Sequence, residues 1–293
     1  MGVWQLARAK VNLTLKVLGR RSDGYHELES LVTFAAVADR LSLVPGEPTH
    51  LVASGPYADA IEAPNILERA LDLLRQQGVD LRGAIALEKN LPVAAGLGGG
   101  SADAAALLRL ARALHAERLE EPLWREVARR LGADVSVCLA DRPALIRGIG
   151  DEVDPLPPGA EPLPAVLANP GVRLATPRVF AALDAPPVDR TSARDLPPAP
   201  LRCRQALFDH MGAVGNDLER PAAALEPVIA TLKAALLARP GCRAAAMSGS
   251  GPTCFGIFAS EDDAAAAALA LRSRWPRWWI VATNLDDVVS LNP

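Results

Sequence analysis

The sequence predicts an α+β protein with two domains. Its 293 residues are enough to bury more than one hydrophobic core. Segments typical of strands alternate with segments typical of helices in both halves of the chain. Twelve of the 25 prolines fall between Pro155 and Pro200, and the run over residues 155–159 is typical of a domain boundary. We therefore expect an N-terminal domain over residues 1–153 and a C-terminal domain over residues 154–293.

The elements of the N-terminal half follow from the spacing of its apolar residues. Alternating or short apolar runs predict strands over residues 3–17, 31–37, 41–44, 51–53, 84–87, 135–139 and 145–147. An apolar stripe that starts after Asn65 and ends before Gly78 predicts a helix over residues 65–77. Alanine- and leucine-rich runs predict two more helices, over residues 102–115 and 123–131.

The C-terminal half shows the same alternation. Its patterns predict helices over residues 222–237 and 262–275, and strands over residues 244–247, 253–258 and 278–283. The second proline-dense stretch, residues 185–200, is predicted to be a surface loop. The sequence contains no repeat of fixed period.

Composition argues against several classes of function. The net charge of -3, the lack of a long basic run and an aromatic content of 4% argue against a nucleic-acid partner. No apolar run is long enough to span a bilayer, and no hydrophobic segment follows Arg8 and Lys10 as in a secretory signal. The four cysteines show no metal-ligand or disulfide spacing. We therefore expect free thiols in the reducing cytoplasm and no membrane partner.

A glycine loop, Gly96-Leu97-Gly98-Gly99-Gly100-Ser101, precedes the alanine-rich helix. Glycine allows the backbone to approach a ligand closely, and the start of a helix offers unpaired N–H groups and a favourable dipole for anions. The loop therefore predicts a phosphate site. It is not a Walker-A loop, because no Gly-Lys-Ser/Thr follows, and serine stands where a dinucleotide fingerprint needs its third glycine. The alternative is a tightly packed turn without a ligand.

Two polar residues interrupt apolar segments and are candidates for chemistry. Lysine is rare in this arginine-rich chain, and Lys10 shares one face of a predicted strand with Asn12. That face either points to solvent on an edge strand, or it presents a lysine and an amide to an anionic or hydroxyl substrate. Asp134 lies between a helix end and a predicted strand. It either forms a turn or pairs with a cation and handles a proton.

Two further turns carry suggestive residues. Tyr25 and His26 follow Asp23-Gly24, and their rings suit a heteroaromatic base; the alternative is a turn with two half-exposed rings. Residues 248–251, Ser-Gly-Ser-Gly, form a second glycine turn between apolar strands, which by itself could be a hairpin.

Taken together and in order, five segments resemble the GHMP kinase superfamily: residues 9–13, 23–28, 92–105, 132–135 and 248–253. The segments around Lys10 and Tyr25-His26 are similar to those of members whose acceptor is a methylerythritol linked to cytidine diphosphate. The resemblance implies transfer of the γ-phosphoryl group of ATP to the 2-hydroxyl of that unit, in the non-mevalonate route to isoprenoid precursors. It also implies a ribosomal-protein-S5-like N-terminal domain for ATP and catalysis, and a ferredoxin-like C-terminal domain for the substrate.

The resemblance also implies roles for individual residues. Lys10 and Asp134 match the catalytic pair. The ATP-binding positions are Asn65, Lys89, Pro92, Gly96, Leu97, Gly98, Gly99, Gly100 and Ser101. The substrate-binding positions are Asn12, Tyr25, His26, Thr176 and Phe180, and the closing glycine turn is Gly249, Ser250 and Gly251. Mg²⁺ is expected to accompany ATP without a dedicated metal site, with the Ser101 hydroxyl as its candidate protein ligand.

Two alternative functions accompany this interpretation, and the chain departs from the residues of some relatives at three positions. A kinase for homoserine or a mevalonate-like alcohol is one alternative, but such substrates lack the base that Tyr25, His26 and Phe180 suit. A non-catalytic nucleotide-binding module is the other, which the presence of both Lys10 and Asp134 disfavours. Ala94-Ala95 stand where some relatives have glycine, and Pro252 stands where some have alanine. The oligomeric state, monomer or homodimer, stays open.

Overall fold

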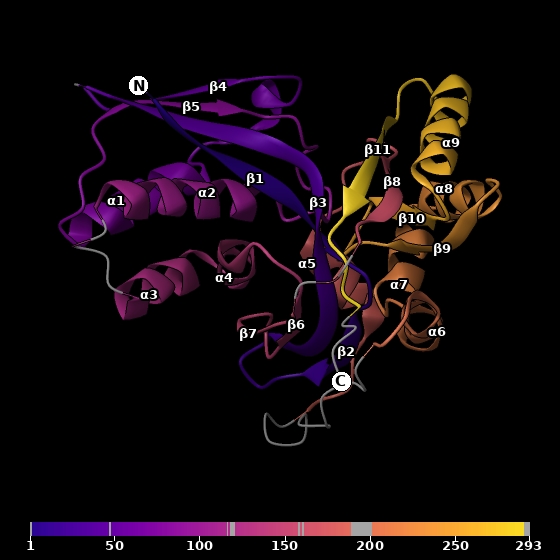
Figure 1. Cartoon of the computed structure of the whole chain (residues 1–293). Helices are drawn as coiled ribbons and strands as arrows, with labels where there is room; N and C mark the ends of the chain where they lie inside the picture. Colours follow the sequence, from indigo (N-terminus) through magenta and orange to yellow (C-terminus); the bar gives the residue numbers. More distant parts are fainter. Residues whose placement is uncertain are drawn as a thin grey trace. The chain divides into compact units, whose positions relative to one another are not determined.

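The structure is a computed structural model that describes residues 2–46, 48–115, 117, 121–157, 159, 161–188 and 201–289 (Figure 1). The chain divides into two compact units. Unit 1 comprises residues 1–9, 38–93 and 98–141, and unit 2 comprises residues 10–37, 94–97 and 142–293. These units do not follow a single boundary near residue 153, because strands β1 (Val3–Asn12) and β3 (His26–Pro45) each contribute residues to both. Most of the predicted proline-rich loop, residues 189–200, lies outside the described residues.

Within the described residues, unit 1 combines strands with four α-helices. Besides parts of β1 and β3, it contains β4 (His50–Ser54), the short 3₁₀ helix η1 (Ala58–Ala60), α1 (Ile66–Gln76), β5 (Gly83–Glu88), α2 (Gly99–Leu114), α3 (Glu121–Leu131) and α4 (Ala133–Ala140). Strand β5 pairs with β3 in antiparallel fashion and with β4 in parallel. The helices lie together on one side of these strands (Figure 1). The predicted helices over residues 65–77, 102–115 and 123–131 are confirmed as α1, α2 and α3.

Helix α1 shows how local sequence determines an element. Asn65 is its N-cap and forms a capping box with Glu68, which satisfies N–H groups that the first turn leaves without partners. Leu67 and Leu74 belong to its buried apolar stripe. Capping and periodicity therefore agree, and the helix begins and ends close to the predicted residues.

Helix α4 stands where the sequence predicts a strand. The strand predicted over residues 135–139 is wrong, because these residues lie in α4. A short apolar run has no period that separates a buried strand from a buried helix. Here the run packs against α2 and α3, with Val135, Val137 and Cys138 buried, and Asp134 falls in the first helical turn. Packing between helices therefore decides the conformation that the sequence leaves ambiguous.

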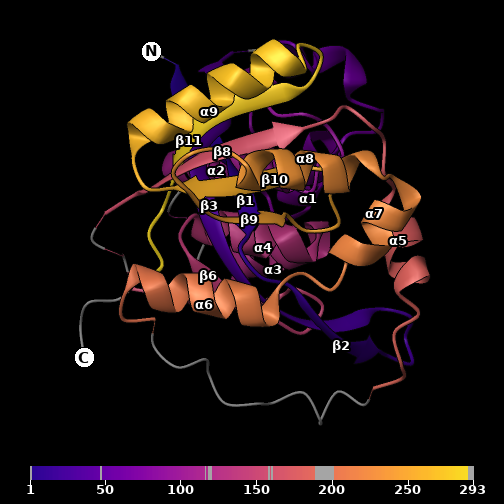
Figure 2. The ribbon, with the colours of Figure 1, turned by 90° about the vertical axis from the view of Figure 1, so that its right-hand side faces the viewer.

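Unit 2 places helices against an antiparallel sheet. It contains β2 (Lys16–Arg20), β6 (Ala144–Arg147), β7 (Glu152–Pro155), β8 (Leu163–Asn169), α5 (Thr176–Leu183), α6 (Arg204–Val214), α7 (Glu219–Leu225), α8 (Val228–Leu237), β9 (Cys242–Met247), β10 (Cys254–Phe258), α9 (Glu261–Arg274) and β11 (Trp279–Leu285). The strand order β11-β8-β10-β9 forms this sheet, and α8 and α9 pack against it (Figure 2). Its core includes Val166, Leu232, Phe258 and Leu271.

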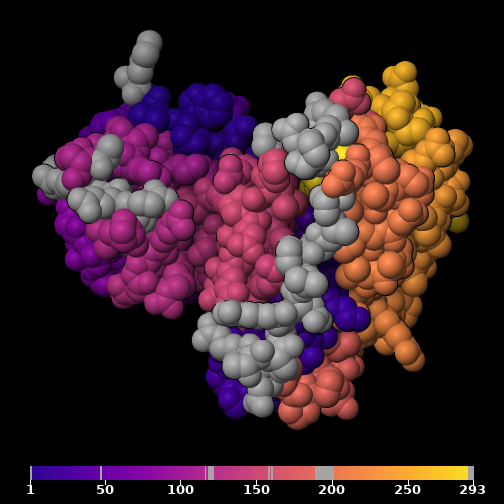
Figure 3. Space-filling model, turned by 60° about the horizontal axis from the view of Figure 1, so that its bottom comes forward, coloured from indigo at the N-terminus to yellow at the C-terminus, as the bar shows by residue number. Residues whose placement is uncertain are grey.

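Several predicted elements differ from the structure. Residues 3–17 are two strands rather than one, the strands at 31–37 and 41–44 are parts of the single strand β3, and the helix over 222–237 is divided into α7 and α8. Strand β8 was not predicted, because all of its residues are buried and it therefore shows no alternation. Helix α6, orange on the surface in Figure 3, was not predicted either.

No helix in the described ranges has both the length and the apolar character that crossing a membrane requires.

Candidate active site

The glycine loop leads into the first turn of α2. Gly98 is the N-cap in the left-handed conformation, with φ of 63°, and its carbonyl accepts the N–H of Ala102 at 2.8 Å. The N–H groups of Gly99, Gly100 and Ser101 belong to the first helical turn, where no intrahelical acceptor exists. Gly98 has no side chain to cap them. These N–H groups and the helix dipole can therefore bind an anion such as a phosphate.

Gly96 lies where two loops of unit 2 meet. Its φ is +75°, and a Cβ atom added there would lie 2.4 Å from the Ser248 carbonyl oxygen, so only glycine fits. The Ser248 hydroxyl donates to the Gly96 carbonyl at 2.9 Å and accepts the N–H of Asn12 at 3.1 Å. The Lys10 N–H donates to the Leu97 carbonyl at 2.9 Å. Within unit 2, the end of β1, the start of the glycine loop and the second glycine turn are thus held together.

Lys10 and Asn12 do not face solvent. Their exposed fractions are 5% and 2%, so the alternative of a solvent-facing edge strand is wrong for both residues. The Asn12 amide nitrogen donates to the Ser30 hydroxyl at 2.8 Å, whereas its Oδ1 is buried and accepts no hydrogen bond in the described part of the chain. Gly249 is adjacent, since a Cβ there would lie 3.3 Å from Oδ1. A buried acceptor without a donor is a suitable contact for a substrate hydroxyl.

Asp134 lies in the first turn of α4 in unit 1 and is half-buried. An acidic side chain at this end interacts favourably with the helix dipole. The other end of α4 is fixed by two arginines: Arg109 of α2 donates to the Cys138 carbonyl at 2.9 Å, and Arg8 pairs with Asp141 at 2.9 Å. The helix that carries Asp134 is therefore held by side chains of the same unit.

The expected adenine-site residues of unit 1 lie near the start of α2. Asn65 caps α1, with its Oδ1 accepting the N–H of Leu67 at 2.8 Å. Ile66 is adjacent to the glycine loop, since a Cβ at Gly100 would lie 3.8 Å from Ile66 Cγ2. Pro92 is buried. The beginnings of α1 and α2 are therefore neighbours.

Lys89, expected in the same adenine site, is part of a buried ion cluster. Its Nζ lies 2.5 Å from Asp39 Oδ2 and 2.6 Å from Asp103 Oδ2. Burial by itself lowers the pKa of the Lys89 ammonium, but the Asp103 and Asp39 carboxylates outweigh burial and raise it. Neither aspartate is among the site residues that the sequence predicts. Asp103 stands out as a lone carboxylate in an alanine run, whereas nothing in the sequence distinguishes Asp39.

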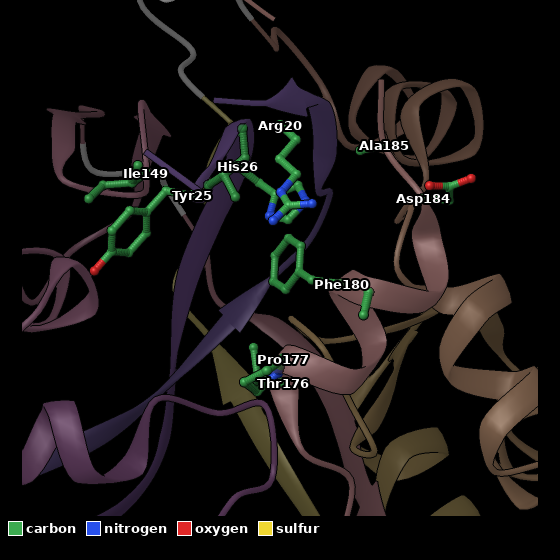
Figure 4. A pocket seen from close by; sticks show the side chains of 12 residues that line it. Arg20, Tyr25, His26, Ile149, Thr176, Pro177, Phe180, Asp184 and Ala185 are labelled. Carbon is green, nitrogen blue, oxygen red and sulfur yellow. The ribbon is translucent and has the colours of Figure 1, made fainter. Parts of the chain in front are cut away.

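Unit 2 contains a pocket of about 460 Å³ that Tyr25, His26, Thr176 and Phe180 help to line (Figure 4). The His26 and Phe180 rings contact each other, with centroids 4.6 Å apart and planes inclined by 30°. Tyr25 stands apart from this pair and is 60% exposed (Figure 4). Burial, and then the nearby Arg20 guanidinium, lower the pKa of His26. A neutral imidazole can both donate and accept hydrogen bonds, as recognition of a base requires.

The pocket is joined to the second glycine turn. The Thr176 and Ser250 hydroxyls are hydrogen-bonded at 2.8 Å. The Asn216 side chain donates to the carbonyls of Met247 and Gly249, both at 2.8 Å, and so fixes the turn. Neither Asn216 nor Arg20, which lines the pocket, is among the site residues that the sequence predicts. The second glycine turn, with Gly249 and Ser250, is thus directly connected to the aromatic pocket within unit 2.

Ala94, just before the glycine loop, is one of the positions where some relatives have glycine. Ala94 has φ of +52°, in the left-handed region that favours glycine. The alanine therefore occupies a conformation that a glycine would adopt with less strain.

The fold and the glycine loop define the class of the protein. The model of the GHMP kinase N-terminal domain matches residues 65–148, and the model of the GHMP kinase C-terminal domain matches residues 202–277. A homoserine kinase from Cytophaga hutchinsonii shares the fold, with a TM-score of 0.66 at 18% identity over 97% of this chain and 95% of its own. The two-domain α+β fold is therefore that of the GHMP kinases.

Relatives with higher sequence identity to this chain identify its family within the GHMP kinases. A 4-diphosphocytidyl-2-C-methyl-D-erythritol kinase of Rhodopseudomonas palustris (strain HaA2) is 48% identical over 96% of this chain and 97% of its own length. A crystal structure of a 4-(cytidine 5'-diphospho)-2C-methyl-D-erythritol kinase is 39% identical, with a TM-score of 0.77, and is matched over 97% of this chain and 100% of its own. The chain belongs to the 4-diphosphocytidyl-2-C-methyl-D-erythritol kinase family of the GHMP kinases.

Proposed function

We propose that the chain transfers the γ-phosphoryl group of ATP to the 2-hydroxyl of 4-diphosphocytidyl-2-C-methyl-D-erythritol, in the non-mevalonate route to isoprenoid precursors. The main support for this proposal is the aromatic pocket of unit 2, together with the hydrogen bond that joins its Thr176 to Ser250. We assign the cytosine to this pocket, where Tyr25 stands on one side and the paired rings of His26 and Phe180 stand on the other (Figure 4). Asn12 Oδ1, which accepts no hydrogen bond from the described residues, is available to a hydroxyl of the methylerythritol.

Lys10 and Asp134 are the proposed catalytic residues. The acceptor is a tertiary alcohol, which is too weak an acid to ionise unaided at neutral pH. Phosphoryl transfer mainly requires positioning and charge stabilisation, and a carboxylate can accept the hydroxyl proton. The Lys10 ammonium supplies a compact positive charge that favours alkoxide character on the attacking oxygen, where an arginine would bring a wider planar group. The support is the resemblance of both segments and the burial of Lys10.

The glycine loop is the proposed ATP site. Backbone N–H groups from Gly96 to Ser101 bind the phosphates, and the region of Asn65, Lys89 and Pro92 receives the adenine. The described residues contain no cluster of three histidines, cysteines or acidic residues for a metal ion. Mg²⁺ enters with ATP in this proposal, with the Ser101 hydroxyl as its protein ligand, and it neutralises charge on the phosphates.

We also propose where the enzyme is located and how many copies of the chain it contains. We place the enzyme in the cytoplasm, which its four free thiols support. It acts as a monomer or a homodimer, and light scattering of the purified protein distinguishes the two.

The reaction is tested by comparing acceptors. We expect kcat/KM with 2-C-methylerythritol alone to be about 10- to 100-fold lower than with the cytidine diphosphate-linked substrate, because stacking of a base is worth roughly 1–3 kcal/mol. A coupled ADP-release assay measures both. Higher activity on homoserine or mevalonate would support the alternative kinase, and a lack of ATP turnover with every acceptor would support a non-catalytic module.

Substitution of Tyr25 tests the base pocket separately. Tyr25→Ala is expected to raise KM for the cytidine substrate about tenfold and to leave kcat nearly unchanged, because it removes one aromatic face. Tyr25→Phe is the matched control, since it keeps the ring and should keep KM. Steady-state kinetics with saturating ATP measures the effect. An unchanged KM in the alanine variant would remove Tyr25 from the base site.

A further inference from the structure

Arg20 is the one lysine or arginine among the described residues that line the aromatic pocket. It is exposed, and its guanidinium forms neither an ion pair nor a hydrogen bond with any described residue. The next residue, Arg21, differs, because it pairs with Asp23 at 2.8 Å and with Glu27 at 3.5 Å. Asp184, the acidic residue of the lining, stands apart from Arg20 (Figure 4). The Arg20 guanidinium is therefore available to a ligand of the pocket.

The main chain at Arg20 is held on both sides. Arg20 is the last residue of β2 and pairs with His26, the first residue of β3. Its N–H donates to the Pro186 carbonyl at 2.7 Å, and its carbonyl accepts the N–H of Val188 at 2.9 Å. Residues that face each other on paired strands are neighbours, and the charge of Arg20, after burial, lowers the pKa of His26. Arg20 and His26 therefore occupy the same end of the pocket (Figure 4).

The position of Arg20 decides which part of the substrate it meets. Thr176 lies at the end of the pocket opposite to Arg20, and its hydroxyl is hydrogen-bonded to Ser250 (Figure 4). The second glycine turn, which contains Ser250, lies against Asn12 Oδ1, where the proposed function places the methylerythritol. The ribose and the diphosphate therefore extend toward Thr176. The Watson–Crick edge of the base then faces Arg20 and His26.

A guanidinium at this edge can distinguish one pyrimidine from another. It stays charged, and its N–H groups only donate hydrogen bonds. Cytosine offers two adjacent acceptors, O2 and N3, and the guanidinium can donate to both, as it does to paired acceptors of other bases. Uracil carries a hydrogen on N3. One N–H of the guanidinium would then face another donor, so a hydrogen bond is lost and two donors oppose each other.

We propose that Arg20 is a specificity-determining residue, which selects cytosine over uracil by donating to O2 and N3 of the base. This inference rests on the proposed function, which places the base in the aromatic pocket. A guanidinium that only attracted the diphosphate would favour cytidine- and uridine-linked substrates equally. The preference between the two bases therefore separates recognition of the base from general attraction of charge.

The test compares kcat/KM for methylerythritol linked to cytidine diphosphate and to uridine diphosphate. We expect the wild type to prefer the cytidine-linked substrate about 10- to 100-fold, the range for one bidentate contact to a base. Arg20→Met keeps the apolar stem and removes the donors, so this preference should fall about tenfold. Part of the fall should be a rise in kcat/KM for the uridine-linked substrate, because no donor then faces its N3–H.

Two further variants complete the test. Arg20→Gln can donate or accept a hydrogen bond, so it should lose the preference as Arg20→Met does. Arg243→Met is the matched control, since Arg243 is an exposed residue of β9 that does not line the pocket, and it should keep the wild-type preference. Improved activity on the uridine-linked substrate cannot result from damage to the fold.

The possible results separate the role of Arg20 from the proposed function. A wild type that phosphorylates both substrates equally well overturns the role of Arg20 alone. That role is likewise overturned if folded Arg20→Met or Arg20→Gln keeps the wild-type preference, even with lower activity on both substrates. A wild type without turnover of the cytidine-linked substrate overturns the proposed function, and the role of Arg20 with it. Thermal unfolding identifies which variants are folded, and either variant at position 20 decides the matter with the wild type.

Discussion

Asp134→Asn is expected to lower kcat by about 10²- to 10⁴-fold, the range in which a positioned proton acceptor contributes. The amide has the shape of the carboxylate but cannot accept the proton of the tertiary hydroxyl. Asn is also tolerated in the first turn of α4, so the helix should persist. ATP binding should change little, because the proposed phosphate contacts come from the glycine loop. Single-turnover kinetics and calorimetry with an ATP analogue measure the two quantities.

The same exchange at Asp72 provides the control for Asp134. Asp72 is an exposed residue of α1 that pairs with Arg75 at 3.0 Å, so Asp72→Asn removes a carboxylate of unit 1 outside the proposed catalytic groups. Its kcat should equal that of the wild type. Near-normal turnover in purified, folded Asp134→Asn would refute the proposed role of Asp134 as proton acceptor.

Lys10→Met should have the next largest effect, a fall in kcat of about 10²- to 10³-fold, as for removal of one preorganised electrostatic contact. Lys10 is buried on β1, so methionine is chosen to keep the apolar stem packed while the charge is removed. The loss should appear in kcat more than in KM for ATP, because the charge is needed where the acceptor oxygen becomes negative. Steady-state kinetics with both substrates varied measures how the loss divides between kcat and KM.

Lys10→Arg separates the shape of the cation from its charge. A planar guanidinium cannot replace a compact ammonium, so we expect this variant to stay at least about tenfold below the wild type in kcat. Lys233→Met is the control, because Lys233 lies on α8 and pairs with Glu219 away from the aromatic pocket. Thermal unfolding of all three variants identifies any loss of fold. Wild-type kcat in folded Lys10→Met would exclude Lys10 from catalysis.

The sequence by itself determined the elements whose signals lie within a few residues. The capping box of Asn65 and Glu68 and the apolar stripe behind it determine α1. The run of glycines before an alanine-rich segment indicates the loop and α2, although the helix begins at Gly99, three residues before the predicted start. The order of the motifs was enough to indicate the family, which the relatives then confirmed.

Tertiary structure alone decided the features that depend on distant partners. The apolar run after Asp134 became a helix because it packs against α2 and α3, and β8 showed no period because neither of its faces meets water. The buried cluster of Asp39, Lys89 and Asp103 joins residues that are 50 and 14 positions apart. Likewise, only the fold shows that Asn12 Oδ1 is buried and accepts no hydrogen bond from the described residues. The physical reason is that backbone preference and capping are local, whereas burial, ion pairing and unsatisfied hydrogen bonds depend on which distant segments the fold brings into contact.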